Sequence, residues 1–174
     1  MAISTLTVRD ASAADAAACA EIYAPYVTET AISFETEPPA PETMRARIEA
    51  ALREYAWLVL EDGGEVVGYA YGGPYKERAA YRRSCEVSIY LKMSLRRTGG
   101  GRLLYATLFE RLAARGYSTA VAGVALPNAA SVGIHTSMGF ELVGVFRKIG
   151  WKNDAWHDVA WYQRSLSDPA PTPA

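Results

Sequence analysis

Apolar and polar residues alternate over several short stretches of the chain, and this alternation predicts β-strands. The clearest stretches are residues 3–10, 56–61, 65–72 and 85–92. A period of two places successive side chains on opposite faces of a strand. Because Asp62, Gly63 and Gly64 form the whole connection between the second and third stretches, these two are predicted to pair as a hairpin.

Other stretches carry apolar residues three and four positions apart, which predicts helices. The four predicted helices span about residues 12–26, 41–55, 101–115 and 127–139. Ser12 with Asp15 offers a capping pair for the first helix. Pro41 suits the first turn of the second helix, and Gly116 suits the end of the third.

Three further strands are predicted near the end of the chain. Residues 117–126 are nearly all apolar, which is typical of a strand buried on both faces, and residues 141–150 and 158–166 form closing strands. The order of elements mixes hairpins with helical crossovers, so we expect an α+β fold around one central mixed sheet. Residues 1–166 are expected to form a single domain, and the Pro- and Ala-rich residues 167–174 a disordered tail.

The charge balance narrows the classes of partner. The chain has 18 Lys and Arg against 19 Asp and Glu, so it lacks the bulk positive field that gathers nucleic acid or an anionic membrane. No apolar run approaches the roughly 18 residues of a membrane helix. Cys19 and Cys85 are single and far apart, which predicts neither a metal site nor a disulfide framework and favours the cytoplasm.

Three glycines, Gly99 to Gly101, precede the third predicted helix. A loop that leaves a strand and opens a helix exposes backbone N–H groups and suits a phosphate. A packed turn is an equally good reading of a lone glycine triplet. The P-loop is excluded because Arg102 and Leu103 stand where it needs Lys and Ser or Thr, and the dinucleotide fingerprint because its third glycine falls on Leu104.

Residues 96–101, read as Arg-Arg-Thr-Gly-Gly-Gly, resemble the Gln/Arg-x-x-Gly-x-Gly/Ala loop of the GNAT superfamily of N-acetyltransferases, which binds the coenzyme A pyrophosphate. Asn128, His135 and Gly139-Phe140 follow the spacing of that superfamily. The segments "ISFETEP", "YAWLV", "GPYKERAAY", "EVSIYL" and "NDAWHDVAWYQ" are similar to phosphinothricin acetyltransferases and the related methionine sulfone/sulfoximine acetyltransferases. The resemblance spans Leu6 to Leu166.

The resemblance implies a twisted, mostly antiparallel sheet flanked by about four helices. It also implies that the strand before the glycine loop carries a bulge and splays from the next strand, so that the two hold acetyl-CoA. The implied acetyl-CoA contacts are Val87, Ser88, Ile89, Arg96, Arg97, Thr98, Gly99, Gly100, Gly101, Arg102, Asn128 and Ser131. No metal is implied.

Two residues align with catalytic positions of the family. Glu86 aligns with the general base that takes the proton of the acceptor amine, and His135 stands where relatives place the acid that protonates the leaving sulfur, or it assists the base. Without the resemblance, Glu86 would be read as a solvated or ion-paired strand end, and His135 as a packed residue.

The implied substrate contacts are Phe34, Lys76, Arg78, Tyr81 and Tyr90. The expected activity is direct acetylation of the α-amino group of phosphinothricin, or of methionine sulfone or sulfoximine, by a homodimer. Another small amine, a protein N-terminus and a non-catalytic acyl-CoA-binding module remain as alternatives; Lys76 and Arg78 disfavour polyamines, because like charges repel.

Overall fold

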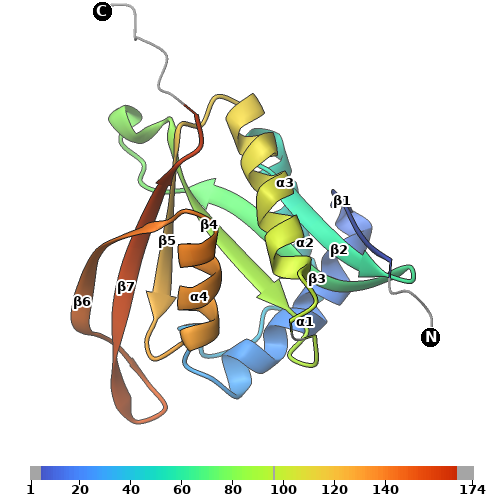
Figure 1. Ribbon diagram of the computed structural model, residues 1–174. Coiled ribbons are helices and arrows are strands. Elements are labelled where there is room, and N and C mark those ends of the chain that lie inside the picture. Colours follow the sequence, from blue (N-terminus) through green and yellow to red (C-terminus); the bar gives the residue numbers. More distant parts are fainter. Residues whose placement is uncertain (1–4, 96, 168–174) are drawn as a thin grey trace, which may run out of the picture.

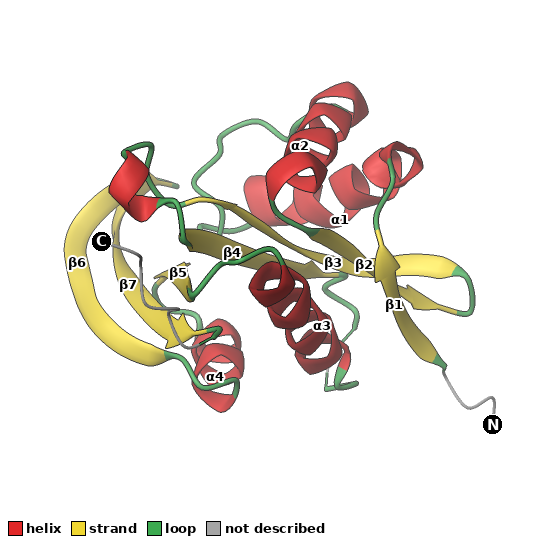
Figure 2. Cartoon of the chain, turned by 90° about the horizontal axis from the view of Figure 1, so that it is seen from above, coloured by secondary structure: helices red, strands yellow, loops and turns green. Residues whose placement is uncertain are grey.

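The computed structural model describes residues 5–95 and 97–167. One twisted sheet forms the middle layer of the fold, with α1 and α2 against one face and α3 and α4 against the other (Figures 1 and 2). The strands are β1 (Leu6–Asp10), β2 (Trp57–Asp62), β3 (Glu65–Pro74), β4 (Ser84–Leu91), β5 (Thr119–Ala125), β6 (Glu141–Lys152) and β7 (Ala155–Ser165). The helices are α1 (Ala16–Thr28), α2 (Pro41–Glu54), α3 (Gly100–Ala114) and α4 (Ala129–Ser137), with the 3-10 turns η1 (Ala13–Asp15) and η2 (Ala79–Tyr81).

The predicted order of strands and helices and the α+β class are confirmed; the two 3-10 turns are additions. The first helix starts as predicted at Ser12, whose hydroxyl accepts the N–H of Ala14, while the Asp15 carboxylate accepts the N–H of Ser12. Arg9 donates to both oxygens of Asp15, at 2.8 and 2.9 Å. This ion pair ties the end of β1 to the start of the first helix.

The sheet has the order β1-β2-β3-β4-β5-β7-β6. Every neighbouring pair is antiparallel except β4 and β5, which α3 connects as a crossover. The parallel pair is joined at three positions only, the last of them Glu86 with Val121. Beyond that position β4 and β5 separate, as the splayed strands of the predicted fold require.

The implied bulge in β4 is not found in its ladder with β3. Residues Cys85–Leu91 pair with Gly68–Pro74 one for one, without a shift in register. The register shifts lie instead in the β2–β3 and β6–β7 ladders. The separation of β4 from β5 therefore comes from lost pairing on one side of β4, while its other side stays regularly bonded.

Apolar side chains fill both faces of the sheet. Leu104, Leu108 and Leu112 of α3 are fully buried, which confirms the predicted stripe of that helix, and they pack with Leu58 and Leu60 of β2. On the opposite face, Ile22, Met44 and Ile48 of α1 and α2 pack against Trp57 and Val59. Strand β2 is thus covered on both faces, so successive apolar residues of this strand are buried alternately in one core and the other.

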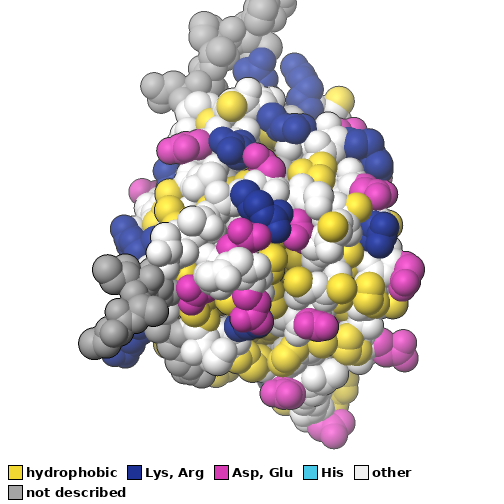
Figure 3. Space-filling view, turned by 90° about the vertical axis from the view of Figure 1, so that its right-hand side faces the viewer, with side chains coloured by type: hydrophobic (Ala, Val, Ile, Leu, Met, Phe, Trp, Pro, Cys, Tyr) yellow, Lys and Arg dark blue, Asp and Glu magenta, His cyan; other side chains and the backbone are white. Residues whose placement is uncertain are grey.

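Outside these cores the described surface carries charged side chains and also exposed large apolar residues, most of them on β6. Figure 3 shows basic and acidic side chains interspersed over one face. Within residues 5–95 and 97–167, no helix is long and apolar enough to cross a membrane. Of the predicted tail 167–174, only Ser167 is described, and its hydroxyl donates to the Tyr117 carbonyl.

Candidate active site

The separation of β4 from β5 opens an inter-strand cavity. It is lined by Ile32, Val87, Ser88, Ile89, Tyr90, Tyr105, Gly123, Val124, Ala125, Asn128, Ser131 and His135. Five of the predicted acetyl-CoA contacts meet here, namely Val87, Ser88, Ile89, Asn128 and Ser131. The backbone of β4 beyond Glu86 is not paired with β5, so an extended ligand can occupy the place of a strand.

The glycine loop forms the start of α3. Gly99 is the residue before the helix, with φ of +80°, a left-handed conformation that costs glycine least. Gly100 and Gly101 are buried in the first turn, and a Cβ on Gly101 would lie 2.7 Å from Cδ1 of Ile134 in α4. A side chain at this position would therefore force the end of the Ile134 side chain to move.

The N-terminus of α3 is open toward solvent on its loop side. Arg97, Thr98 and Arg102 are exposed, while Arg96 lies outside the described residues. The first-turn N–H groups and the positive end of the helix dipole favour an anion at this point. The Thr98 hydroxyl accepts from the Gly100 N–H at 3.4 Å.

Asn128 and Ser131 organise the start of α4. The Asn128 side-chain oxygen accepts from the Ser131 N–H at 3.1 Å and caps the helix. The Ser131 carbonyl lies 2.7 Å from Nδ1 of His135. Both residues thus line the inter-strand cavity and hold the helix that carries His135.

His135 is almost fully buried, at 3% exposure. Because a carbonyl oxygen can only accept, the contact with Ser131 assigns the ring proton to Nδ1. Nε2 then accepts from the Tyr105 hydroxyl at 2.9 Å. Burial lowers the pKa of His135, with partial compensation by the Ser131 bond. The imidazole is therefore neutral near pH 7 and directs no proton into the cavity.

Glu86 lies where the β4–β5 pairing ends. It is partly buried, and its side chain makes no hydrogen bond or ion pair to another described residue. Burial raises the pKa of its carboxyl group. A carboxylate with a raised pKa and free lone pairs is suited to accept a proton.

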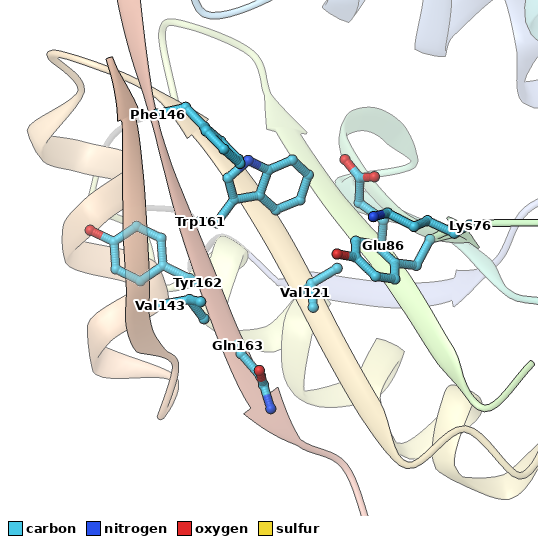
Figure 4. A pocket seen from close by; sticks show the side chains of 9 residues that line it. Lys76, Glu86, Val121, Val143, Phe146, Trp161, Tyr162 and Gln163 are labelled. Carbon is cyan, nitrogen blue, oxygen red and sulfur yellow. The ribbon is translucent and has the colours of Figure 1, made fainter. Parts of the chain in front are cut away.

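The Glu86 side chain lines a second space, the Glu86 cavity, of about 370 Å³ (Figure 4). Its other lining residues are Tyr75, Lys76, Val121, Val143, Phe146, Trp161, Tyr162 and Gln163. The Lys76 ammonium group lies 5.3 Å from the ring centre of Tyr75 and 5.7 Å from that of Tyr81. The cavity therefore combines a carboxylate, an ammonium group and an aromatic wall.

The remaining predicted substrate residues take different positions. Tyr81 contacts Tyr75 at a ring distance of 5.4 Å, whereas Arg78 is exposed at the start of η2 and lines neither cavity. Tyr90 lines the inter-strand cavity and packs among Tyr23, Tyr26 and Tyr69. Phe34 is 41% exposed and lies over Gly150 near His157.

Several residues that line the two cavities were not among the predicted site residues, Tyr105, Phe146 and Trp161 among them. No local pattern marks these three as site residues, because each enters the site through contacts between distant parts of the chain. The buried Lys152 was missed as well; its Nζ donates to the carbonyls of Val27 and Ser33, at 2.7 and 2.6 Å, and ties the α1–α2 loop to β6.

The geometry fits the acetyl-CoA that the sequence resemblance implies. An extended cavity between separated strands, next to a glycine-rich helix N-terminus, provides one place for a pantetheine arm and another for a pyrophosphate. Among the described residues, no group of three or more His, Cys, Asp and Glu side chains lies in a metal-binding arrangement.

Comparison with known proteins agrees with this geometry. Residues 8–161 match the acetyltransferase (GNAT) domain. The chain is 38% identical to phosphinothricin N-acetyltransferase of Streptomyces viridochromogenes, covering 94% of this chain and 90% of the relative. It is 34% identical to L-methionine sulfoximine/L-methionine sulfone acetyltransferase of Pseudomonas aeruginosa, covering 94% and 95%.

Solved structures also match this fold over almost the whole chain. A GNAT superfamily phosphinothricin acetyltransferase from Sinorhizobium meliloti in complex with acetyl-CoA superimposes with a TM-score of 0.91, at 35% identity, over 97% of this chain and 92% of that one. The match of domain, relatives and fold over almost the whole chain shows that it belongs to the GNAT acetyltransferase family.

Proposed function

We propose that the protein transfers an acetyl group from acetyl-CoA directly to the α-amino group of phosphinothricin or of methionine sulfone or sulfoximine. The observation that carries this proposal is the end of the β4–β5 pairing at Glu86, since Glu86 lines the Glu86 cavity and the next residue, Val87, lines the inter-strand cavity. A donor in the inter-strand cavity and an amine in the Glu86 cavity would meet beside one carboxylate.

Acetyl-CoA supplies an activated acetyl thioester. The backbone of Val87, Ser88 and Ile89 would hold its pantetheine arm and its carbonyl oxygen, since N–H groups aimed at a developing oxyanion stabilise it. The glycine loop from Arg96 to Arg102 would hold the pyrophosphate at the α3 N-terminus. Asn128 and Ser131 would complete the site from α4.

Glu86 would accept the proton that the amine loses as the C–N bond forms. The C–S bond of the thioester then breaks, and coenzyme A leaves as a thiolate that takes up a proton from solvent. The raised pKa of Glu86 brings the carboxylate closer to the operating pH, which improves a general base. Lys76 would bind the substrate carboxylate across the same cavity. Tyr81, which contacts Tyr75 of this cavity, would complete the acceptor site together with Tyr90 and Phe34.

For His135 the hydrogen bonds favour a positioning role over direct protonation of the leaving sulfur. Its Nε2 accepts from Tyr105, a residue that also lines the inter-strand cavity. In this arrangement His135 would orient the Tyr105 hydroxyl, whose oxygen keeps a lone pair to accept a hydrogen bond.

We also propose that the enzyme is a cytoplasmic homodimer with one catalytic domain over residues 1–166. Support for a dimer comes from β6, whose exposed apolar residues are Leu142, Val143, Val145, Phe146, Ile149 and Trp151. A group of exposed apolar side chains of this kind on one strand is typical of a protein interface.

A thiol-release assay with acetyl-CoA tests the proposal. We expect free coenzyme A with phosphinothricin, methionine sulfone or methionine sulfoximine, and none with the Glu86→Gln variant, which should still bind acetyl-CoA in calorimetry. No release with any of the three amines would refute the substrate, and lack of acetyl-CoA binding would refute the activity.

A further inference from the structure

Trp161 lies at the junction of the two cavities. Its indole lines the Glu86 cavity and packs on Gly123, which lines the inter-strand cavity. A Cβ on Gly123 would lie 3.3 Å from both Cη2 and Cζ2 of the indole. The absence of a side chain at Gly123 therefore allows the indole to lie close against β5.

The strand geometry extends this junction toward Glu86. On β4, Glu86 and Ser88 are two residues apart, and on β5 the same holds for Val121 and Gly123, so each pair shares one face of its strand. Figure 4 shows the Trp161 ring projecting from β7 over β5, on the side where Glu86 lies. An amine held beside Glu86 would thus extend its side chain along the indole.

Aromatic and aliphatic groups surround the indole. The Tyr75 ring meets Trp161 edge-on at 6.4 Å, and Phe146 and Val143 of β6 close the same side of the cavity. An indole also offers one N–H donor beside its apolar face. This wall suits a side chain with an apolar body and an uncharged dipolar end.

The charges point to the same class of acceptor. Of the side chains described at this cavity, Lys76 is the cation and Glu86 the anion, and Arg78 stays outside. A zwitterionic amino acid places its carboxylate at Lys76 and its amine at Glu86. A second anionic group would face the aromatic wall with no further cation beside it, which is unfavourable.

Resting on the proposed function, we propose that Trp161 determines acceptor specificity, and that the preferred acceptors are α-amino acids with an uncharged, dipolar side chain. A methionine sulfone meets this description, whereas phosphinothricin carries a second anion. The contact is between the acceptor side chain and the indole, so Trp161 acts on the choice of acceptor and leaves the donor site unchanged.

Steady-state kinetics with methionine sulfone and with phosphinothricin test this inference. We expect a higher kcat/KM for methionine sulfone in the unmodified enzyme. Trp161→Ala should lower that value roughly tenfold, as expected for a lost apolar contact in a pocket, and lower the value for phosphinothricin less. Gly123→Ala displaces the indole without removing it. This variant should shift the ratio of the two kcat/KM values, methionine sulfone over phosphinothricin, in the same direction.

Trp156→Ala removes an exposed tryptophan of the same hairpin that lines neither cavity, and serves as the matched control. Acetyl-CoA affinity, measured by calorimetry, should be equal in the unmodified enzyme, Trp161→Ala and Trp156→Ala; Gly123→Ala is left out of this comparison because Gly123 lines the inter-strand cavity. The inference is overturned if the unmodified enzyme prefers phosphinothricin, or if Trp161→Ala lowers both values equally. Failure of the unmodified enzyme to acetylate either amine would instead refute the proposed function.

Discussion

At the scale of single residues, burial sets the chemistry of the two predicted catalytic groups in opposite directions. It raises the pKa of Glu86 and lowers that of His135, because in each case the low-dielectric surroundings disfavour the charged form. A carboxyl group that binds a proton more readily suits a base, whereas a histidine kept neutral is a poor acid. The two residues also differ in hydrogen bonding, since both ring nitrogens of His135 are hydrogen-bonded, whereas the Glu86 carboxylate has no hydrogen-bond partner among the described residues.

Glu86→Gln should reduce kcat by about 10²–10⁴-fold, the usual contribution of a general base. The variant should also be more stable at pH 8. The pKa of Glu86 is higher in the folded state than in the unfolded state. The protonated carboxyl group therefore makes its full contribution to folding stability below the unfolded-state pKa of about 4.3, and this contribution is lost as the pH rises through the folded-state pKa.

Thermal melts of both proteins at pH 4 and pH 8 check this prediction. The gain in Tm should be a few degrees or less at pH 8, since Glu86 is only partly buried, and should shrink at pH 4. Glu49→Gln, at an exposed position of α2, is the matched control and should change neither quantity. Unchanged kcat in Glu86→Gln would exclude Glu86 as the base.

Tyr105→Phe should destabilise the fold by about 1–3 kcal/mol, because it leaves the buried Nε2 of His135 without its donor. Nitrogen chemical shifts of the unmodified protein should show the Nδ1–H tautomer at pH 7. The pKa of His135 is lower in the folded state than in the unfolded state. The neutral imidazole therefore makes its full contribution to folding stability above the unfolded-state pKa of about 6.5, and this contribution is lost as the pH falls through the folded-state pKa.

The pH profile of kcat separates positioning from acid catalysis. If His135 only orients Tyr105, kcat shows no loss as pH rises through 6.5, and His135→Gln, which keeps an acceptor for Tyr105, recovers activity lost in His135→Ala. An alkaline decline near the His135 pKa that disappears in His135→Gln would establish it as the acid.

At the scale of elements, the site depends on how closely α3, α4 and β4 approach one another. Gly101 is the contact point, since a Cβ there would meet Ile134 of α4 at 2.7 Å and Ile89 of β4 at 3.6 Å. The glycines of the loop thus serve both the anion site and the packing beneath it. The two sequence interpretations, a phosphate loop and a packed turn, are compatible.

Gly101→Ala should cost about 1–3 kcal/mol, as overpacking of a well-packed core does. Ile134→Val removes the Cδ1 atom that the new methyl group would meet, so the double variant should recover part of the loss. Gly133→Ala, in α4 with open space around its Cβ position, should instead stabilise by about 0.5–1 kcal/mol. Urea unfolding of the unmodified protein, the three single variants and the double variant gives these values; additive losses in the double variant would contradict the packing explanation.

At the scale of the whole molecule, β6 is the strand whose apolar side chains are mostly exposed and not buried in a hydrophobic core. Figure 2 shows it bending away at the opposite end of the sheet from β1. Leu142 and Ile149 are 56% and 57% exposed, and each lies at one of the two register shifts in the β6–β7 ladder. A surface of this kind is suited to a second copy of the chain.

The double variant Leu142→Glu/Ile149→Glu should shift the protein from dimer to monomer in light scattering, because two buried charges per subunit would oppose association. Ala106→Glu, at an exposed position of α3, is the control and should leave the mass unchanged. A monomeric unmodified protein would contradict the proposed interface.

The amino-acid sequence by itself determined the order of the elements, the capped start of the first helix at Ser12, the buried stripe of α3 and the family segments around the glycine loop. These features rest on local spacing, and periodicity and capping act within a few residues. The sequence resemblance also brought Glu86, Lys76 and His135 forward as site residues.

Only the tertiary structure decided how those residues are arranged. Three features involve residues that are distant along the chain or lie on different elements. They are the hydrogen bond between Tyr105 and His135, the packing of Trp161 on Gly123, and the position of Arg78 outside the Glu86 cavity. Their physical basis is packing and hydrogen bonding through space, which local spacing does not encode. The same holds for the opening between β4 and β5, which arises because their pairing ends at Glu86 and Val121.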